Sequence, residues 1–143
     1  INDEWIFFSN YNSPKSKQFE SHDQISAVIY WNSINVQIRM KAKIQKTNLE
    51  FSNEHFQSRD VTKNLLAILS RQSEPIPSYN DFLKNYEKEL SLKFNNSSRP
   101  EYWGGFSFYP YYFEFWEGHN SRVNKRKFYE LKNQEWKSGF LQP

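Results

Sequence analysis

The sequence predicts a mainly β, α+β domain in which four to six antiparallel strands form a partly closed barrel with helices packed outside. Three observations carry this prediction. Residues 36–47 alternate apolar with polar side chains, residues 103–116 form a dense aromatic run, and residues 78–94 place apolar side chains at helical spacing. Period-two alternation is typical of a strand with one face on the core, whereas a spacing of three and four residues is typical of an amphipathic helix.

The first third of the chain predicts a strand, a short helix and a hairpin. Residues 5–9 are aromatic and strand-like, and Ser13 with Pro14 behind it is typical of the start of a helix that we expect to end near His22. Residues 24–31 are rich in β-branched and aromatic side chains. We therefore expect them to pair with residues 36–47 in an antiparallel hairpin.

The middle third predicts three helices. Thr47 and Glu50 have the spacing of a capping box, which would open a helix running towards Arg59. Asp60 is a good cap for a second helix over 61–69, and Ser78 for a longer helix that we expect to end near Phe94. A loop with two prolines separates these two helices, and a polar linker follows the third.

The last third predicts strands at 103–109 and 111–116 and a final hairpin that joins 126–131 to 135–140. Between these, polar donors recur at every second position from Ser121 onward. If that run is extended, Arg122, Asn124 and Arg126 point to the same side. One donor-rich face beside a wall of aromatic rings is suited to a flat, anionic ligand.

Composition narrows the classes of function. Aromatic residues make up 19% of the chain, so the core is built largely from Phe, Tyr and Trp. The longest apolar runs are far too short to cross a bilayer, and the absence of cysteine fits a reducing cytoplasm, so we expect a cytoplasmic protein without membrane partners. An ordinary solvated surface explains the net charge of +3 as well as a polyanionic partner would. The sequence shows no concentrated run of basic residues, so we expect no nucleic-acid partner.

Candidate ligand-binding residues are cationic rather than metal-binding. The histidines at 22, 55 and 119 lack the spacing of a metal site, so we predict no metal. His55, Arg59 and Lys63 are spaced four apart, and on one continuous helix they would form a stripe able to clasp a phosphate or carboxylate. The alternative is a set of solvated surface charges, with Asp60 ending the helix between them.

Several blocks of the sequence, taken together, resemble the pyridoxamine 5′-phosphate oxidase family. They are FFSNYNSPKSKQ at 7–18, VQIR at 36–39, HFQSR at 55–59, SRQSEPI at 70–76, and WGG with EFWEGHNSRVNKR within 103–126. The resemblance covers almost the whole chain. It implies an antiparallel split β-barrel of the FMN-binding type, a homodimer with FMN at the subunit interface, and a single domain over 1–143 that lacks the first strands of the family.

The resemblance also implies which residues would bind the cofactor FMN: Ser9, Lys15, Gln37, Gln72, Ser73, Trp116 and Arg126. The residue types suit the role. Lys15 and Arg126 supply positive charge for the FMN phosphate, the glutamines donate to or accept from the edge of the isoalloxazine ring, and Trp116 offers a flat apolar surface.

On the substrate side, the resemblance places His55, Arg59 and Lys63 at the phosphate of a phosphorylated pyridoxine-type substrate. It places Arg122 and Asn124 at the substrate ring, as the catalytic pair. The chain departs from the family pattern at four positions. His55 stands for a tyrosine, Lys63 for a serine, Asn124 for a histidine and Pro14 for an arginine that helps hold the flavin phosphate.

The leading hypothesis is an FMN-dependent enzyme that oxidises pyridoxamine or pyridoxine 5′-phosphate to pyridoxal 5′-phosphate, with oxygen as acceptor and hydrogen peroxide as product. The first alternative is a flavin- or pyridoxal-phosphate-binding protein of the same fold without oxidase activity, which the replacement at Asn124 favours. The second is a protein that stacks single-stranded nucleic acid on its aromatic residues.

Overall fold

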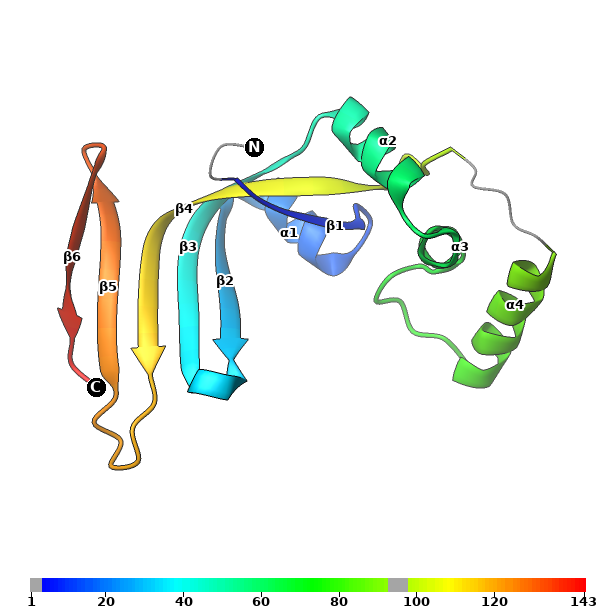
Figure 1. The fold of residues 1–143 in the computed structure, drawn as a ribbon. Coiled ribbons are helices and arrows are strands. Elements are labelled where there is room, and N and C mark those ends of the chain that lie inside the picture. The colour runs from blue at the N-terminus through cyan, green and yellow to red at the C-terminus, as the bar shows by residue number, and fades with distance from the viewer. Residues whose placement is uncertain (1–3, 93–97) are drawn as a thin grey trace. The chain divides into compact units, whose positions relative to one another are not determined.

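The computed structural model describes residues 4–92 and 98–143 of the chain. Its elements follow one another in the order β1 (Trp5–Asn10), α1 (Pro14–Ser21), β2 (Gln24–Trp31), the 3-10 helix η1 (Asn32–Ile34), β3 (Val36–Lys46), α2 (Leu49–Ser58), α3 (Val61–Leu69), α4 (Tyr79–Ser91), β4 (Trp103–Glu117), β5 (Lys125–Lys132) and β6 (Glu135–Leu141) (Figure 1). The chain divides into two compact units. The sheet unit comprises the stretch up to residue 5, residues 23–44 and residues 108–143, and the helical unit comprises residues 6–22 and 45–107.

The strands of the sheet unit lie in the order β2-β3-β4-β5-β6, so each is a neighbour of the next along the chain (Figure 1). The β2–β3 hairpin pairs Ile29 with Ile38, and the β5–β6 hairpin pairs Phe128 with Gly139. Both hairpins confirm the sequence prediction. Their strands are rich in β-branched and aromatic side chains, which suit a pleated surface with one buried face.

The core of the sheet unit follows the alternation of β3. Met40, Ala42 and Ile44 are almost fully buried, while the intervening lysines point outward and are exposed. Phe108 of β4 is also buried and stacks with Trp5, with 6.2 Å between the ring centroids. The predicted period of two therefore decides which side chains of β3 build the core.

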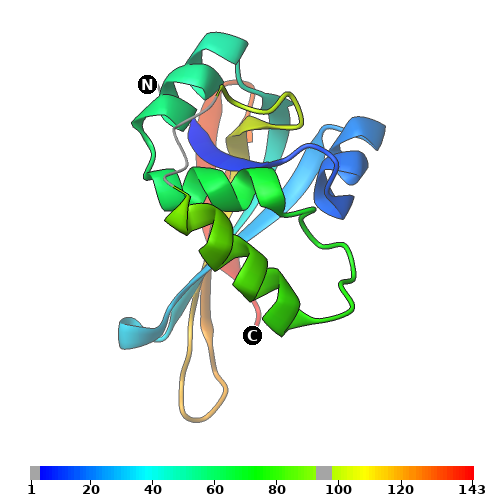
Figure 2. The same ribbon diagram turned by 90° about the vertical axis from the view of Figure 1, so that its right-hand side faces the viewer.

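The helical unit is built around β1, which pairs with β4. Its most deeply buried apolar side chains are Phe56, Leu65, Trp103 and Phe106. Helices α3 and α4 contact each other (Figure 2), and the hydroxyl of Tyr86 donates to the carbonyl of Thr62 across that contact. The amphipathic pattern of the sequence thus correctly predicts helices in this region.

The helix starts are set by short polar side chains. The carboxylate of Asp60 caps α3 and the hydroxyl of Ser78 caps α4, as predicted. The predicted capping box at Thr47 is wrong. Asn48 is the cap of α2 and accepts from the amide of Phe51, because the hydroxyl of Thr47 is engaged with that of Ser52 at 2.9 Å.

The aromatic block forms one strand rather than the two that were predicted. Strand β4 continues through Pro110, because the fixed φ of proline suits an extended chain and only one ladder donor is lost. Helix α4 ends at Ser91, and the predicted end at Phe94 lies outside the described residues.

The predicted extended run over 121–126 is also wrong for its first half. Strand β5 begins at Lys125, and the residues before it form the loop that joins β4 to β5. Within that loop Arg122 has a left-handed φ of 63°, and its amide donates to the carbonyl of His119. The side-chain oxygen of Asn124 accepts from the amide of His119 at 3.0 Å, which closes the loop. The local hydrogen bonds of these residues outweigh the strand pattern.

Gly105 provides a test of the packing between β4, β1 and the start of α2. A Cβ added there would lie 2.5 Å from Thr47 Oγ1 and 2.9 Å from Thr47 Cγ2, closer than atoms pack. We expect Gly105→Ala to lower the free energy of unfolding by about 1–3 kcal/mol in urea titrations. Thr47→Ala should rescue part of this loss in the double variant, and equal losses with and without Thr47 would contradict the clash.

Candidate functional site

The predicted site residues divide between the two units. The helical unit holds Ser9, Lys15, His55, Arg59, Lys63, Gln72 and Ser73. The sheet unit holds Gln37, Trp116, Arg122, Asn124 and Arg126. Within each unit the structure brings several of these side chains into direct contact.

A polar cluster in the helical unit joins three of the predicted FMN contacts. The ammonium group of Lys15 donates to the hydroxyls of Ser9 at 3.0 Å and Ser13 at 3.2 Å. The side-chain oxygen of Gln72 accepts from the hydroxyl of Ser9 at 3.1 Å and from the amide of Asn10 at 3.0 Å. An ammonium has three donors, so Lys15 keeps one for a ligand.

The loop that carries Gln72 also shapes a cavity. Ser73, another predicted FMN contact, has a left-handed φ of 70°, which turns the chain sharply. A cavity of about 350 Å³ opens beside Gln72, and its lining includes Asn10, Arg71 and Tyr102. Its walls are largely polar, which suits a ligand rich in hydrogen-bonding groups.

An aromatic stack supports the two most sheltered members of the predicted phosphate clasp. The ring of His55 lies on that of Phe8, with 3.7 Å between centroids and 6° between planes. Phe8 in turn stacks with Trp103 at 5.2 Å, and the guanidinium of Arg59 lies 4.5 Å from the centroid of the Trp103 ring. Aromatic contacts on one side leave the polar edges of His55 and Arg59 for other partners.

Arg59 carries an unsatisfied donor. Its Nη1 atom is buried and has no hydrogen-bond partner among the residues that the structure describes. Burial also lowers the pKa of Arg59, although an arginine side chain stays charged at any physiological pH. A buried, charged donor without a partner is costly, and an oxyanion would relieve that cost.

His55, Arg59 and Lys63 do not share one continuous helix, which is the alternative in which Asp60 ends the helix between them. Helix α2 ends at Ser58, Arg59 is its C-cap with extended backbone, and α3 begins only at Val61. Asp60 causes the break, because its carboxylate accepts from the amide and the hydroxyl of Thr62. These hydrogen bonds also lower the pKa of Asp60. Lys63 therefore lies on a separate helix from His55.

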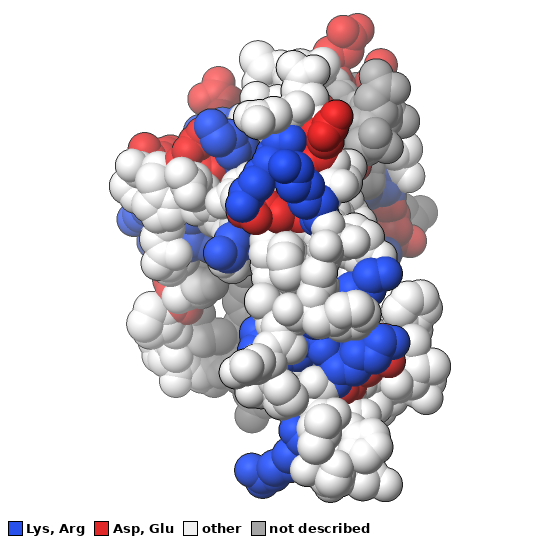
Figure 3. Space-filling view, turned by 90° about the vertical axis from the view of Figure 1, so that its left-hand side faces the viewer, with Lys and Arg blue, Asp and Glu red and all other residues white. Residues whose placement is uncertain are grey.

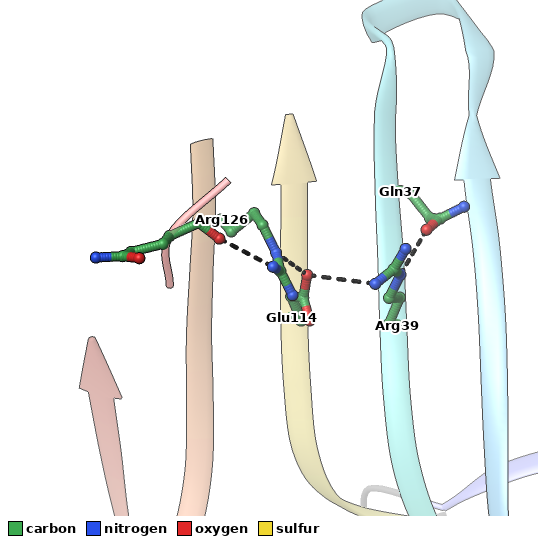
Figure 4. A network of polar contacts seen from close by, with 5 residues as sticks. Gln37, Arg39, Glu114 and Arg126 are labelled. Carbon is green, nitrogen blue, oxygen red and sulfur yellow. Dashed lines mark hydrogen bonds and ion pairs between the residues drawn. The ribbon is translucent and has the colours of Figure 1, made fainter. Parts of the chain in front are cut away.

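A network of charged and polar side chains crosses three strands of the sheet unit (Figure 4). Arg126 Nε donates to Glu114 Oε1 at 2.7 Å, and Arg39 Nη1 lies 3.6 Å from the same oxygen. Arg39 Nε donates to Gln37 Oε1 at 2.6 Å, and Arg126 Nη1 donates to the carbonyl of Gln142 at 2.9 Å. Two predicted FMN contacts, Gln37 and Arg126, are thus linked through Arg39 and Glu114.

The carboxylate of Glu114 is the centre of this network. The residue is only 5% exposed, and the hydrogen bond from Arg126 is the main cause that lowers its pKa. The same hydrogen bond raises the pKa of Arg126. Burial and the nearby charge of Glu114 raise the pKa of Tyr112. Glu114 is therefore ionised at neutral pH and holds the two guanidinium groups beside it.

The remaining predicted residues of the sheet unit lie at the β4–β5 end. Trp116 and Arg126 are direct partners across the two strands and are therefore neighbours in the sheet. Arg122 and Asn124 lie in the preceding loop instead of on a strand face. The oxygen of Asn124 is used to close that loop, which leaves its amide nitrogen as the group able to donate.

Sequence reasoning missed Arg39 and Glu114. A signal for Glu114 was available, because an acid in the middle of the aromatic run FEFWE is expected to be buried and to need a cationic partner. Arg39 carried no comparable signal, since an arginine in an alternating strand is most simply solvated.

Two structural findings concern other classes of site. Among residues 4–92 and 98–143, no three His, Asp or Glu side chains gather as a metal ion would need. None of the helices in that part of the chain is long and apolar enough to span a membrane.

Comparison with known sequences places the chain in a family. A family model described as the pyridoxine 5′-phosphate oxidase C-terminal dimerisation region matches residues 103–143. The pyridoxine/pyridoxamine 5′-phosphate oxidase 1 of Hydrogenovibrio crunogenus is 33% identical over 144 residues, which are 99% of this chain and 67% of that protein. The corresponding oxidase of Coxiella burnetii is 34% identical over 97% of this chain and 71% of its own length.

A third relative, the oxidase of Herminiimonas arsenicoxydans, is 33% identical over 97% of this chain and 66% of its own length. The chain thus spans about two thirds of the length of these curated relatives.

Two solved structures share the fold. PhzG from Burkholderia lata 383, solved with tetrahydrophenazine-1-carboxylic acid, superposes with a TM-score of 0.82 at 23% identity, covering 96% of this chain and 68% of that one. A pyridoxamine 5′-phosphate oxidase-related, FMN-binding protein from Nostoc punctiforme superposes with a TM-score of 0.73 at 14% identity, covering 100% and 76%. The predicted antiparallel split-barrel fold is confirmed.

The identities exceed 30% over nearly the whole chain, and the matched relatives share one name. The blocks of sequence that first suggested the relationship run from residue 7 to residue 126, so they are not confined to the C-terminal region that the family model matches. The chain belongs to the pyridoxine/pyridoxamine 5′-phosphate oxidase family.

Proposed function

We propose that the protein oxidises pyridoxamine or pyridoxine 5′-phosphate to pyridoxal 5′-phosphate with FMN as cofactor and oxygen as acceptor, and that it works in the cytoplasm. The observation that carries the proposal is the buried, unpartnered Nη1 of Arg59, which supplies a charged donor for the substrate phosphate. Family membership supports the same assignment.

The phosphate would be held by Arg59, with His55 and Lys63 as further donors. Arg59 is prepared for this role, since the ring of Trp103 supports its guanidinium and burial has already removed water from Nη1. A guanidinium presents two parallel donors to a phosphate, whereas Lys63 would add a point charge from α3. Arg122 and the amide of Asn124 are proposed to face the substrate ring.

The polar residues present fit FMN. Lys15 has a spare donor beside Ser9 and Gln72, and Ser73 follows in the turn. In the sheet unit, Gln37, Trp116 and Arg126 would complete the set of contacts. When bound, the flavin supplies a hydride acceptor that passes electrons to oxygen and so yields hydrogen peroxide. The residues of the chain would bind and orient the reactants rather than act as strong bases.

The test is optical and then enzymatic. Purified protein mixed with FMN and freed of excess should be yellow with a flavin spectrum, and adding pyridoxamine 5′-phosphate should release hydrogen peroxide. A yellow protein that releases none would favour the alternative of a binding protein without oxidase activity. A protein that stays colourless would contradict both.

We also propose a homodimer with FMN at the subunit interface. The matched region is described as a dimerisation region, and the sheet unit exposes large apolar side chains that a partner could cover. Trp31 is 57% exposed and, with Ile34, Ile38 and Phe115, lines a groove of about 500 Å³. Lys and Arg groups stand beside acidic groups on the face seen from the side of β6 (Figure 3), a polar surface suited to surround apolar contacts.

Trp31→Glu tests this interface. Placing a charge in a buried apolar contact costs several kcal/mol, so we expect the variant to shift from a dimeric to a monomeric mass in light scattering while its circular dichroism stays unchanged. Leu49→Glu is the matched control, because Leu49 is 67% exposed at the start of α2 in the helical unit. Dimers of equal stability in both variants would place the interface elsewhere.

A further inference from the structure

His55 is held in one orientation by an apolar support. Its ring lies parallel to that of Phe8, with 3.7 Å between centroids, and is also stacked with Trp103 at 6.3 Å. Neither β1 nor β4 therefore presents a titratable group to the ring at these contacts. One face of the imidazole ring packs against the carbon atoms of Phe8, which leaves the ring nitrogens as the atoms that can bind a proton or a ligand.

Among the described residues, Arg59 is the charged group that acts on the pKa of His55. Arg59 is the C-cap of the helix that carries His55, and its positive charge acts on the ring. Glu54 precedes His55 but is exposed, and Asp60 is engaged with Thr62. Burial, followed by the charge of Arg59, lowers the pKa of His55, so the ring is neutral at neutral pH.

We propose that His55 takes up a proton from solvent as a doubly charged phosphate ester binds beside Arg59. The inference rests on the proposed function, because it concerns the same phosphate. No bond of the ester changes, and the proton goes to a ring nitrogen of His55. The permanent charges of Arg59 and, from α3, Lys63 then face the phosphate together with the acquired charge of His55. The site thus prefers a phosphate monoester dianion to a singly charged group such as a carboxylate.

The proposal makes anion affinity depend on pH. Linkage requires affinity to fall as pH rises through the range in which His55 loses its proton, by at most about tenfold per pH unit for one coupled proton. By the same linkage, a bound dianion must shift the titration midpoint of His55 upward. A tyrosine or glutamine at this position would give no such shift.

The experiment is an NMR titration of the histidine ring protons in sodium sulfate and in sodium chloride at equal ionic strength. Sulfate is the probe because it stays doubly charged across the range in which histidine titrates. We expect the midpoint of His55 to be higher in sulfate than in chloride. Equal midpoints for His55 would overturn the proposal.

Two variants separate this proposal from the proposed function. Arg59→Ala should abolish the sulfate-dependent shift of His55 if the anion sits between the two residues, and an undiminished shift would count against the site. His55→Gln, which keeps a neutral donor but cannot take up a proton, should raise the KM for pyridoxamine 5′-phosphate and remove the part of its pH dependence that titration of the substrate phosphate does not explain. If the wild type oxidises pyridoxamine 5′-phosphate but sulfate does not shift the titration midpoint of His55, the proposed function stands and proton uptake is refuted. If sulfate shifts that midpoint but the wild type does not oxidise the substrate, proton uptake stands and the proposed function is refuted.

Discussion

Arg59→Ala should lower kcat/KM for pyridoxamine 5′-phosphate on the order of a hundredfold. The substitution removes a charged donor whose Nη1 atom is already desolvated, a loss of about 3 kcal/mol of binding free energy. The effect should fall mainly on KM, because the phosphate is remote from the bond that reacts and contributes equally before and during the chemical step. Steady-state measurement of hydrogen peroxide release gives both constants.

Two further variants sharpen this expectation. Arg59→Lys keeps the charge but lacks the planar fork, so it should recover only part of the affinity. Lys84→Ala removes one positive charge from the exposed surface of α4 and should leave KM unchanged. A similar rise of KM in Lys84→Ala would show that overall charge, and not the guanidinium of Arg59, attracts the substrate.

Glu114→Ala should cost about 3 kcal/mol of folding free energy, since breaking a buried ion pair leaves the partner charges without compensation. Breaking a buried ion pair costs about 3–5 kcal/mol. The lower value applies here because the side chain of Arg39 is 47% exposed, so water can solvate its charge once the carboxylate is gone. In a chain of 143 residues this corresponds to a fall of about 10 °C in the Tm of the apoprotein. Glu135→Ala is the control, an exposed glutamate of the same sheet.

The pH dependence of folding stability provides a second test of the role of Glu114. Arg126 lowers the pKa of the folded carboxyl below its ordinary value of 4.5, so the ionised form contributes stability that is fully present above about pH 4.5. That contribution is lost as pH falls through the folded pKa. The difference in stability between the wild type and Glu114→Gln should therefore shrink in acid, as followed by urea titrations. A difference that stays constant with pH would mean that packing, and not charge, accounts for the loss.

The elements with a strong local signal were predictable from the sequence. The alternation around Met40 fixed the face of β3, and Asp60 and Ser78 marked helix starts because their side chains satisfy free backbone amides. The errors occurred where a local interaction competes with the pattern. Thr47 pairs with Ser52 instead of capping, and Arg122 adopts a left-handed turn in a run that alternates like a strand.

In the candidate site, too, some features were predictable from the sequence and others depend on the fold. Residue types and family blocks predicted Ser9, Lys15 and Gln72, and the structure joins these three by hydrogen bonds. Long-range packing supplied what the sequence could not. The support of Arg59 by Trp103 joins residues 44 positions apart, and the link from Gln37 to Arg126 needs strands whose order only the fold decides.

The short strand β1 carries neighbouring residues of two clusters. Phe8 supports the ring of His55, and Ser9, the next residue, contacts Lys15 and Gln72. Whatever orders Ser9 therefore also restrains the backbone beneath His55. If binding at one cluster changes the affinity of the other, reciprocity requires the change to be the same factor in both directions.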